Sequence, residues 1–308
     1  MLIRVLGSAA GGGFPQWNCG CPNCVGVRTG SIRAQARSQE SVAVSANGQA
    51  WLMLNASPEV RAQIEGFPGL HPRSLRDTPI AGIVLTNGDL DHALGLLSLR
   101  ESQPLALYST ARVKSGFTEN NVLYRTLQRF DGQVVWHTLE LGEPGPELLV
   151  ANPDGTPSGL GLSAFAAPGK AALHLDQGKP EPGDNIGLLI RDTQSGKTMA
   201  YIPAAGANSA AVTAAAFAAD AVFFDGTFWS SDELIRLGAS KSRAEDMAHW
   251  PLGGPDGSLK FLAGLRARRR IYIHINNSNP ILREDSAERA EVEAAGVEVA
   301  FDGMEFSL

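Results

Sequence analysis

Two carboxylates and an imidazole lie close together in the chain, at Asp89, Asp91 and His92. They follow the apolar, β-branched run at 80–86, which predicts a strand buried on both faces. Side chains at such a strand end are held by the sheet and remain free to bind a ligand. Carboxylate and imidazole together suit a divalent metal ion or proton transfer. The alternative interpretation is a helix N-terminus, where acidic residues complement the helix dipole.

Three further residues are candidates for the same site. Asp225 ends the apolar run at 221–226, His274 follows the apolar residues 271–273, and His249 lies in the sequence Met-Ala-His-Trp-Pro. Residues that end buried strands point toward the rim of a sheet, where a metal ion can bind. Asp91, His92, Asp225, His249 and His274 are therefore the predicted ligands of an active-site metal.

All three cysteines of the chain fall within six residues, at Cys19, Cys21 and Cys24. An odd, crowded set is a poor disulfide framework, whereas three thiolates on one tight turn suit a tetrahedral structural zinc ion. The fourth ligand must then come from far away in the sequence, and His274 and Asn277 are the candidates. The alternative is three ordinary buried or reactive thiols.

The elements that position these residues alternate between strands and helices. An Asn-Gly pair at 47–48 predicts a hairpin, and Ser57 followed by Pro58 predicts a helix start. The Pro- and Gly-rich segment 168–184 is expected to be a mobile loop, and whether it forms a lid is left open. Strands are predicted at 2–6, 41–46, 50–56, 80–86, 105–109, 132–139, 161–167, 185–192, 197–203, 221–226, 270–276 and 297–301, and helices at 93–101, 110–129, 209–219, 258–269 and 284–295.

Composition narrows the class of protein. The 308 residues carry 26 Lys and Arg against 32 Asp and Glu, a net charge of −6, which argues against nucleic acid as the main partner. With 44% hydrophobic and 19% charged residues, wholesale disorder is excluded. No apolar run reaches the ~18–20 residues that a membrane-spanning helix needs. The apolar segment at the N-terminus is too short for a signal peptide. We therefore expect a cytoplasmic protein in a reducing compartment.

One string carries a family resemblance. Residues 86–96, TNGDLDHALGL, resemble the metallo-β-lactamase superfamily motif T-H-x-H-x-D-H-x-x-G-L, with Asn87 and Asp89 in place of its first two histidines. Four longer strings resemble the family of coenzyme PQQ synthesis proteins within that superfamily, over essentially the whole chain: GSAAGGGFPQWNCGCPNC, LTNGDLDHALGLLSLRE, FFDGTFWSSDE and HINNSNPILREDS.

The resemblance implies a fold and a pathway. The fold is an αββα sandwich, two mixed β-sheets flanked by helices, in one domain over residues 1–308. The pathway is the synthesis of pyrroloquinoline quinone (PQQ), a redox cofactor built from a Glu and a Tyr of a precursor peptide. The partners implied are this Glu-Tyr precursor and other proteins of the PQQ pathway.

The departures from the superfamily pattern point to a reaction. The region near 168–170 offers no histidine at the place where the superfamily has one, and 204–206 reads Ala-Ala-Gly where a metal-bridging acid is expected. Two histidines and one carboxylate with open positions suit Fe²⁺ and O₂ chemistry. We therefore predict a non-haem iron oxygenase that hydroxylates the tyrosine ring of the precursor. Asp91, His92 and His274 would hold the metal, and Asp89 would lie beside it or accept a proton.

Two other functions stay open. The altered motif is compatible with a non-catalytic carrier that binds PQQ or its precursor for transport. It is also compatible with a metal-dependent hydrolase, which would need two metal ions per site and would turn over without O₂.

Overall fold

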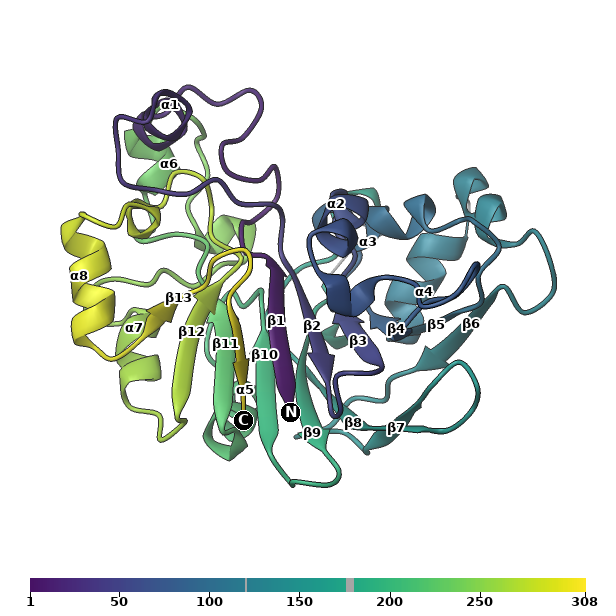
Figure 1. The fold of residues 1–308 in the computed structure, drawn as a ribbon. Coiled ribbons are helices and arrows are strands. Elements are labelled where there is room, and N and C mark those ends of the chain that lie inside the picture. The colour runs from purple at the N-terminus through teal and green to yellow at the C-terminus, as the bar shows by residue number, and fades with distance from the viewer. Residues whose placement is uncertain (120, 176–179) are drawn as a thin grey trace.

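Two seven-stranded sheets pack face to face in the computed structural model, which describes residues 1–119, 121–175 and 180–308 (Figure 1). The first sheet has the order β14(Glu305–Ser307), β1(Leu2–Gly7), β2(Ser41–Ser45), β3(Trp51–Leu54), β4(Ile80–Val84), β5(Leu105–Ser109), β6(Val134–Thr138). The second has the order β13(Glu298–Val299), β12(Arg269–Ile273), β11(Ala221–Asp225), β10(Thr198–Ile202), β9(Ile186–Asp192), β8(Pro157–Ala166), β7(Leu148–Ala151). The predicted αββα sandwich is confirmed.

Each sheet combines antiparallel and parallel pairing. Strands β14, β1, β2 and β3 pair antiparallel, and β3 to β6 pair parallel. In the second sheet β7 to β10 pair antiparallel, and β10 to β13 pair parallel. Parallel strands place their carboxyl ends at one edge, so residues that follow β4, β11 and β12 can share a rim.

Apolar side chains from both faces of each strand explain the continuous apolar runs in the sequence. In β4, Val84 faces the other sheet and Ile83 faces the outer helices. In β11, Phe223 faces inward and Phe224 faces outward in the same way. All four side chains are fully buried. Because both faces are covered, the strands need no polar alternation.

Helices cover the outer faces of the sandwich (Figure 1). The first sheet is covered by α2(Val60–Glu65), α3(Leu90–Ala93), α4(Ala111–Thr118) and the 3₁₀ turns near them. The second is covered by α5(Ala210–Ala218), α7(Ser258–Ala263) and α8(Ala287–Ala294). α1(Pro22–Thr29) and α6(Glu233–Arg236) lie in the loops above the second sheet. Among the described residues, no helix is long and apolar enough to cross a bilayer.

The predicted hairpin at Asn47-Gly48 is confirmed. Asn47 Oδ1 accepts the backbone N–H of Gln49 at 2.8 Å, and Gly48 has φ +74°, a left-handed conformation that glycine adopts without strain. Most other predicted elements form within a few residues of their expected bounds. The short edge strands β7 and β14 were not predicted, because neither shows a long apolar run.

Three helix predictions were wrong in detail. The helix expected at 258–269 ends at Ala263, and Arg269 already begins strand β12. The helix expected at Ser57-Pro58 begins at Val60, since the Ser57 hydroxyl donates to the Gln63 side chain inside the fold. The helix expected at 93–101 ends at Ala93 and continues as a 3₁₀ turn over Leu94–Ser98. The cause is Gly95, where a Cβ atom would lie 2.1 Å from the Ser57 carbonyl oxygen. The chain passes too close to its neighbour there for a regular helix.

The expected mobile loop at 168–184 lies partly outside the described residues. The described part contains short 3₁₀ turns at Leu173–Leu175 and Pro182–Asp184. Residues 176–179, on which the question of a lid depends, lie outside the described residues.

The sandwich core predicts a clear contrast between two leucines. Leu52 is 0% exposed between the sheets, whereas Leu149 on edge strand β7 is 63% exposed. We expect Leu52→Ala to lower the free energy of unfolding by about 2–5 kcal/mol, because it loses buried area and leaves a cavity. Leu149→Ala, the matched control, should change it by about 0.5 kcal/mol or less. Urea unfolding measures both, and equal losses would contradict this placement of the core.

Candidate active site

The five predicted metal ligands come together in one cluster. Asp91, His92 and His274 place ligand atoms within 4.8 Å of one another, and Asp225, His249 and His274 form a second such group. The two groups share His274. The rings of His92 and His249 lie 5.1 and 5.5 Å from that of His274, measured between centroids. Sequence positions almost two hundred residues apart therefore meet in a single site.

Strand ends from both sheets supply these side chains. Asp91 and His92 lie in α3, which follows β4 of the first sheet. Asp225 ends β11, and His274 follows β12 in the second sheet. β11 and β12 run parallel with Asp225 opposite Ile273, so Asp225 and His274 leave the sheet at the same level. His249 comes from the loop before α7.

Asp91 and His274 form an ion pair between residues that follow strands of the two sheets. His274 Nε2 lies 3.2 Å from Asp91 Oδ2. Burial disfavours the charged imidazole, but the hydrogen bond and charge of Asp91 outweigh it and raise the pKa of His274 to about 9. Burial would raise the pKa of Asp91, but the neighbouring His92 and His274 hold it well below its usual range. Without a metal ion, His274 carries the balancing positive charge.

His92 is neutral, and contacts at its Nδ1 hold the ring in place. Burial lowers the pKa of His92 to about 4. Its Nδ1 lies 2.8 Å from Asn55 Nδ2 and 3.0 Å from Thr86 Oγ1, which fixes the ring. Its Nε2 lies 3.7 Å from Asp91 Oδ2. A neutral imidazole is the form that binds a metal ion, so His92 needs no deprotonation to act as a ligand.

Asp225 has both oxygens occupied by donors. Oδ2 accepts from the backbone N–H of Ala205 at 2.9 Å and lies 2.7 Å from His249 Nδ1. Oδ1 accepts from the N–H and the hydroxyl of Thr227 at 3.0 and 2.6 Å. A carboxylate has about four lone-pair sites, and these are used. We therefore propose that Asp225 orients His249 rather than binding the metal itself. His249 Nε2 has no hydrogen-bond partner among the described residues.

A cavity of about 260 Å³ opens onto the cluster. Asp89 lies in its wall, and the Asp89 carboxylate makes no hydrogen bond to another described residue. Burial and then the charge of Asp91 raise the pKa of Asp89, while Lys170 at the mouth partly offsets them. The wall is completed by Ala10, Gly11, Asn87, Ala204, Thr227, Phe228, Met247 and Asn276. The cavity thus has a mixed lining, in which the apolar side chains of Phe228 and Met247 lie among polar residues and Asp89 offers an available carboxylate.

Three supporting residues escaped prediction. The Thr227 hydroxyl oxygen lies 2.9 Å from His274 Nδ1, and the Asn55 side-chain amide contacts His92 Nδ1. Glu40 accepts a hydrogen bond from Asn55 Nδ2 at 2.8 Å, and its second oxygen has no partner among the described residues. Glu40 is 1% exposed, and burial raises its pKa to about 8. A polar residue beside an apolar run is the only sequence signal they offer, and it is a weak one.

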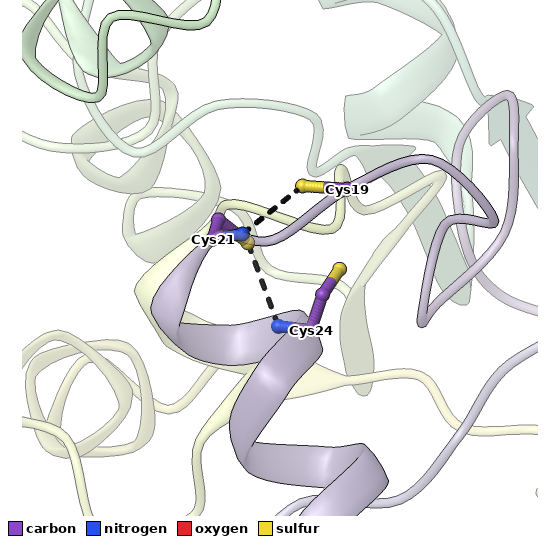
Figure 2. A group of neighbouring side chains, drawn as sticks. All are labelled: Cys19, Cys21 and Cys24. Carbon is purple, nitrogen blue, oxygen red and sulfur yellow. Dashed lines mark hydrogen bonds between the residues drawn. The ribbon is translucent and has the colours of Figure 1, made fainter.

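The three cysteines form a second candidate metal centre above the sandwich (Figure 2). Cys21 caps α1, and its sulfur accepts the backbone N–H of Cys24 at 3.5 Å. Asn277 Nδ2 lies 3.1, 3.6 and 3.3 Å from the sulfurs of Cys19, Cys21 and Cys24. Of the two candidate fourth ligands, the structure places Asn277 at the thiols and His274 in the other cluster. Three thiols converging on one point suit the predicted structural zinc ion.

Comparisons with known proteins agree on fold and family. Residues 50–275 match the family described as a beta-lactamase superfamily domain. The chain is 48% identical to the coenzyme PQQ synthesis protein B of Azoarcus sp. (strain BH72) and 46% identical to that of Stutzerimonas stutzeri, each match covering the whole of both chains. It is similar to the crystal structure of Zn²⁺-bound PqqB from Methylobacterium extorquens, with 40% identity, full coverage of both chains and a TM-score of 0.90. A diphosphatase of the PhnP family, at 18% identity and a TM-score of 0.64, shares the fold.

The buried Glu40 predicts a pH-dependent stability of the metal-free protein. The pKa of Glu40 is about 8 in the fold against 4.5 when exposed, so the folded protein keeps a proton that the unfolded chain releases. This contribution is complete below the unfolded pKa and is lost as the pH rises through 8. Relative to Glu40→Gln, the wild-type free energy of unfolding should fall by about 3 kcal/mol between pH 5 and pH 8.

Urea unfolding in the presence of a chelator measures this difference. Glu65→Gln, at an exposed position, is the matched control and should follow the wild type at every pH. Parallel curves for the wild type and Glu40→Gln would show that Glu40 is not held protonated.

Proposed function

This chain belongs to the coenzyme PQQ synthesis protein B family, and we propose that it acts in PQQ synthesis as a metal-dependent oxygenase. The substrate we propose is the Glu-Tyr unit of the precursor, hydroxylated on its tyrosine ring. Other proteins of the PQQ pathway would supply this precursor and take up the product.

The observation that carries the proposal is the ligand set at the cavity. Asp91, His92 and His274 offer one carboxylate and two imidazoles from two sheets, and His249 lies beside them. Two histidines and one carboxylate with open positions are typical of non-haem Fe²⁺ sites that react with O₂. The donor atoms converge, and His92 and His249 are each held from behind by hydrogen bonds, as metal ligands usually are.

The metal and the protein residues have separate tasks. Asp91, His92 and His274 would hold Fe²⁺, which supplies O₂ activation when bound. Phe228 and Met247 line the cavity and offer apolar contact to an aromatic ring. Asp89 is placed to accept the proton of the ring hydroxyl, because its carboxylate is available and its raised pKa makes it a stronger base than an exposed Asp. Lys170 at the mouth offers a charge partner for a substrate carboxylate.

The site differs from what a two-metal hydrolase needs. The positions of the first two motif histidines carry Asn87 and Asp89, and Asn87 Oδ1 is used to accept the Asp89 N–H at 2.9 Å. After β10, where an acid would bridge two metals, the Ala205 N–H donates to Asp225 instead. These contacts favour one metal ion over two. A carrier role remains the competing outcome, since a binding site alone would use the same cavity.

Reconstitution with iron tests the proposal directly. We expect protein loaded anaerobically with Fe²⁺ to add one oxygen atom to a Glu-Tyr dipeptide when O₂ and a two-electron reductant such as ascorbate are supplied. One oxygen atom enters the ring, and the other leaves as water. Asp91→Ala and His92→Ala should each lose at least about 100-fold of this activity, because each removes a metal ligand. Product mass is the measurement.

Matched controls keep the test specific. Asp131→Ala and His71→Ala remove the same residue types away from the site and should retain activity. An unchanged dipeptide with iron bound to folded protein would favour the carrier, and O₂-independent cleavage with two metals bound would favour the hydrolase.

The orienting role of Asp225 makes a separate prediction. Asp225→Asn replaces a charged acceptor of His249 Nδ1 and should weaken Fe²⁺ binding by about 10- to 100-fold. Asp220→Asn, at the other end of β11, is the matched control and should leave the affinity unchanged. Titration with Fe²⁺ under anaerobic conditions measures both. If Asp225→Asn instead abolished metal binding, Asp225 would be a ligand.

A further inference from the structure

A short segment of chain connects the two candidate metal centres. His274 belongs to the histidine cluster, and Asn277, three residues later, lies over the three sulfurs. Between them, Asn276 lines the active-site cavity. Residues 274–279 thus touch both centres.

His274 has a backbone conformation that its neighbours must maintain. Its φ is +56°, in the left-handed region, which is strained for a residue with a side chain. The Thr227 hydroxyl oxygen lies 2.9 Å from His274 Nδ1, from which the charged imidazole can donate a hydrogen bond. The next residue, Ile275, donates to the Ser8 carbonyl at 3.0 Å and accepts from Ala10 at 2.9 Å. His274 is therefore held at its own position and at the residue that follows it.

The far end of the segment is anchored at the cysteine turn. Besides the contacts of its amide with the three sulfurs, Asn277 accepts a hydrogen bond from Asn23 Nδ2 through its carbonyl at 3.2 Å. Asn279 Nδ2 donates to the Gly226 carbonyl at 2.9 Å, beside Thr227. The segment is consequently tied to α1 at one point and to the turn after β11 at another.

We propose that Asn277 is a positioning residue that couples the two centres, so that a metal ion bound by Cys19, Cys21 and Cys24 increases the affinity of the histidine cluster for its own metal. The amide of Asn277 lies nearly equally far from all three sulfurs, at the fourth corner of a tetrahedral site. Cys19, Cys21 and Cys24 would hold a metal ion beside this amide, and Asn277 would then be restrained. The restraint keeps residues 274–276 on the path that points His274 at Asp91.

The coupling is reciprocal by thermodynamic necessity. If a metal ion bound at the cysteines raises the metal affinity of the histidine cluster by some factor, a metal ion bound at the histidine cluster raises the metal affinity of the cysteines by the same factor. Couplings of this kind usually lie between about 5- and 150-fold, and we expect about tenfold here, because one short segment carries it. The inference rests on the proposed metal-dependent function only for the existence of two metal centres.

Co²⁺ titration of the full-length protein is the test. Cobalt bound by thiolates gives a strong sulfur-to-metal charge-transfer band in the near ultraviolet, and cobalt bound by imidazole and carboxylate gives only weaker visible bands. The two centres can therefore be followed separately. In wild-type protein, we expect the histidine cluster to bind Co²⁺ about tenfold more tightly with the cysteine site filled than in a Cys19→Ser/Cys24→Ser variant.

Asn277→Ala should abolish this difference while the charge-transfer band persists. Asn277→Asp replaces the amide nitrogen over the sulfurs with a carboxylate oxygen, which a metal ion at the cysteines would also restrain, so this variant should retain the coupling. Asn208→Ala, at an exposed position, is the matched control. In a protein that already carries the cysteine substitutions, Asn277→Ala should not lower the Co²⁺ affinity of the histidine cluster any further. The reason is that both changes remove the same coupling. Circular dichroism checks that each variant is folded, and if the cysteine variant is not, the comparison of Asn277→Ala with Asn277→Asp decides the question.

Two results would overturn the inference. One is an Asn277→Ala protein that binds Co²⁺ at the histidine cluster as tightly as wild type with the cysteine site filled. The other is an equal weakening whether the cysteine site is filled or empty, which would indicate a merely structural role. The measurement is metal binding, so a protein with coupled centres and no hydroxylation would refute the proposed reaction alone.

Discussion

The packing of two sheets on one shared core is the constraint on which the site depends. Side chains such as Val84 and Phe223 bury one face of each sheet against the other, and this sets the height of the strands relative to one another. The ends of β4, β11 and β12 then meet at one rim. The contact of Asp91 with His274, 3.2 Å long, closes the rim across the two sheets.

Holding so many polar groups in the interior requires that they satisfy one another. Asp225 and His274 are buried, and each is matched by donors or by an opposite charge. Removing one partner would leave a buried charge unpaired. This lowers the stability of the fold far more than replacing both partners with apolar residues would. Glu40 avoids the problem by staying protonated, as its raised pKa indicates. The orienting contacts of the cluster are therefore made by groups of the protein itself.

The same chain segments serve several purposes, which links stability to function. The turn after β11 orients His249 through Asp225 and supports His274 through Thr227. The segment after β12 carries His274 and also reaches the cysteine turn through Asn277. Because these turns belong to neighbouring parallel strands, a few residues position both candidate metal centres. Because contacts from these turns hold His274 in place, its left-handed backbone conformation is tolerated.

Local patterns in the sequence determined most strands and the motif residues. Apolar runs such as 80–86 and 221–226 predict buried strands wherever they fall, and the crowding of Asp91 with His92 and of the three cysteines is visible in the chain itself. The exact ends of helices were less predictable, because close approaches such as that of Gly95 to Ser57 depend on distant residues. Only the tertiary structure decided which candidate joins which centre. It placed His274 beside Asp91 and Asn277 beside the cysteines, and it recruited Glu40, Asn55 and Thr227, because hydrogen bonds depend on distance in space and not on separation along the chain.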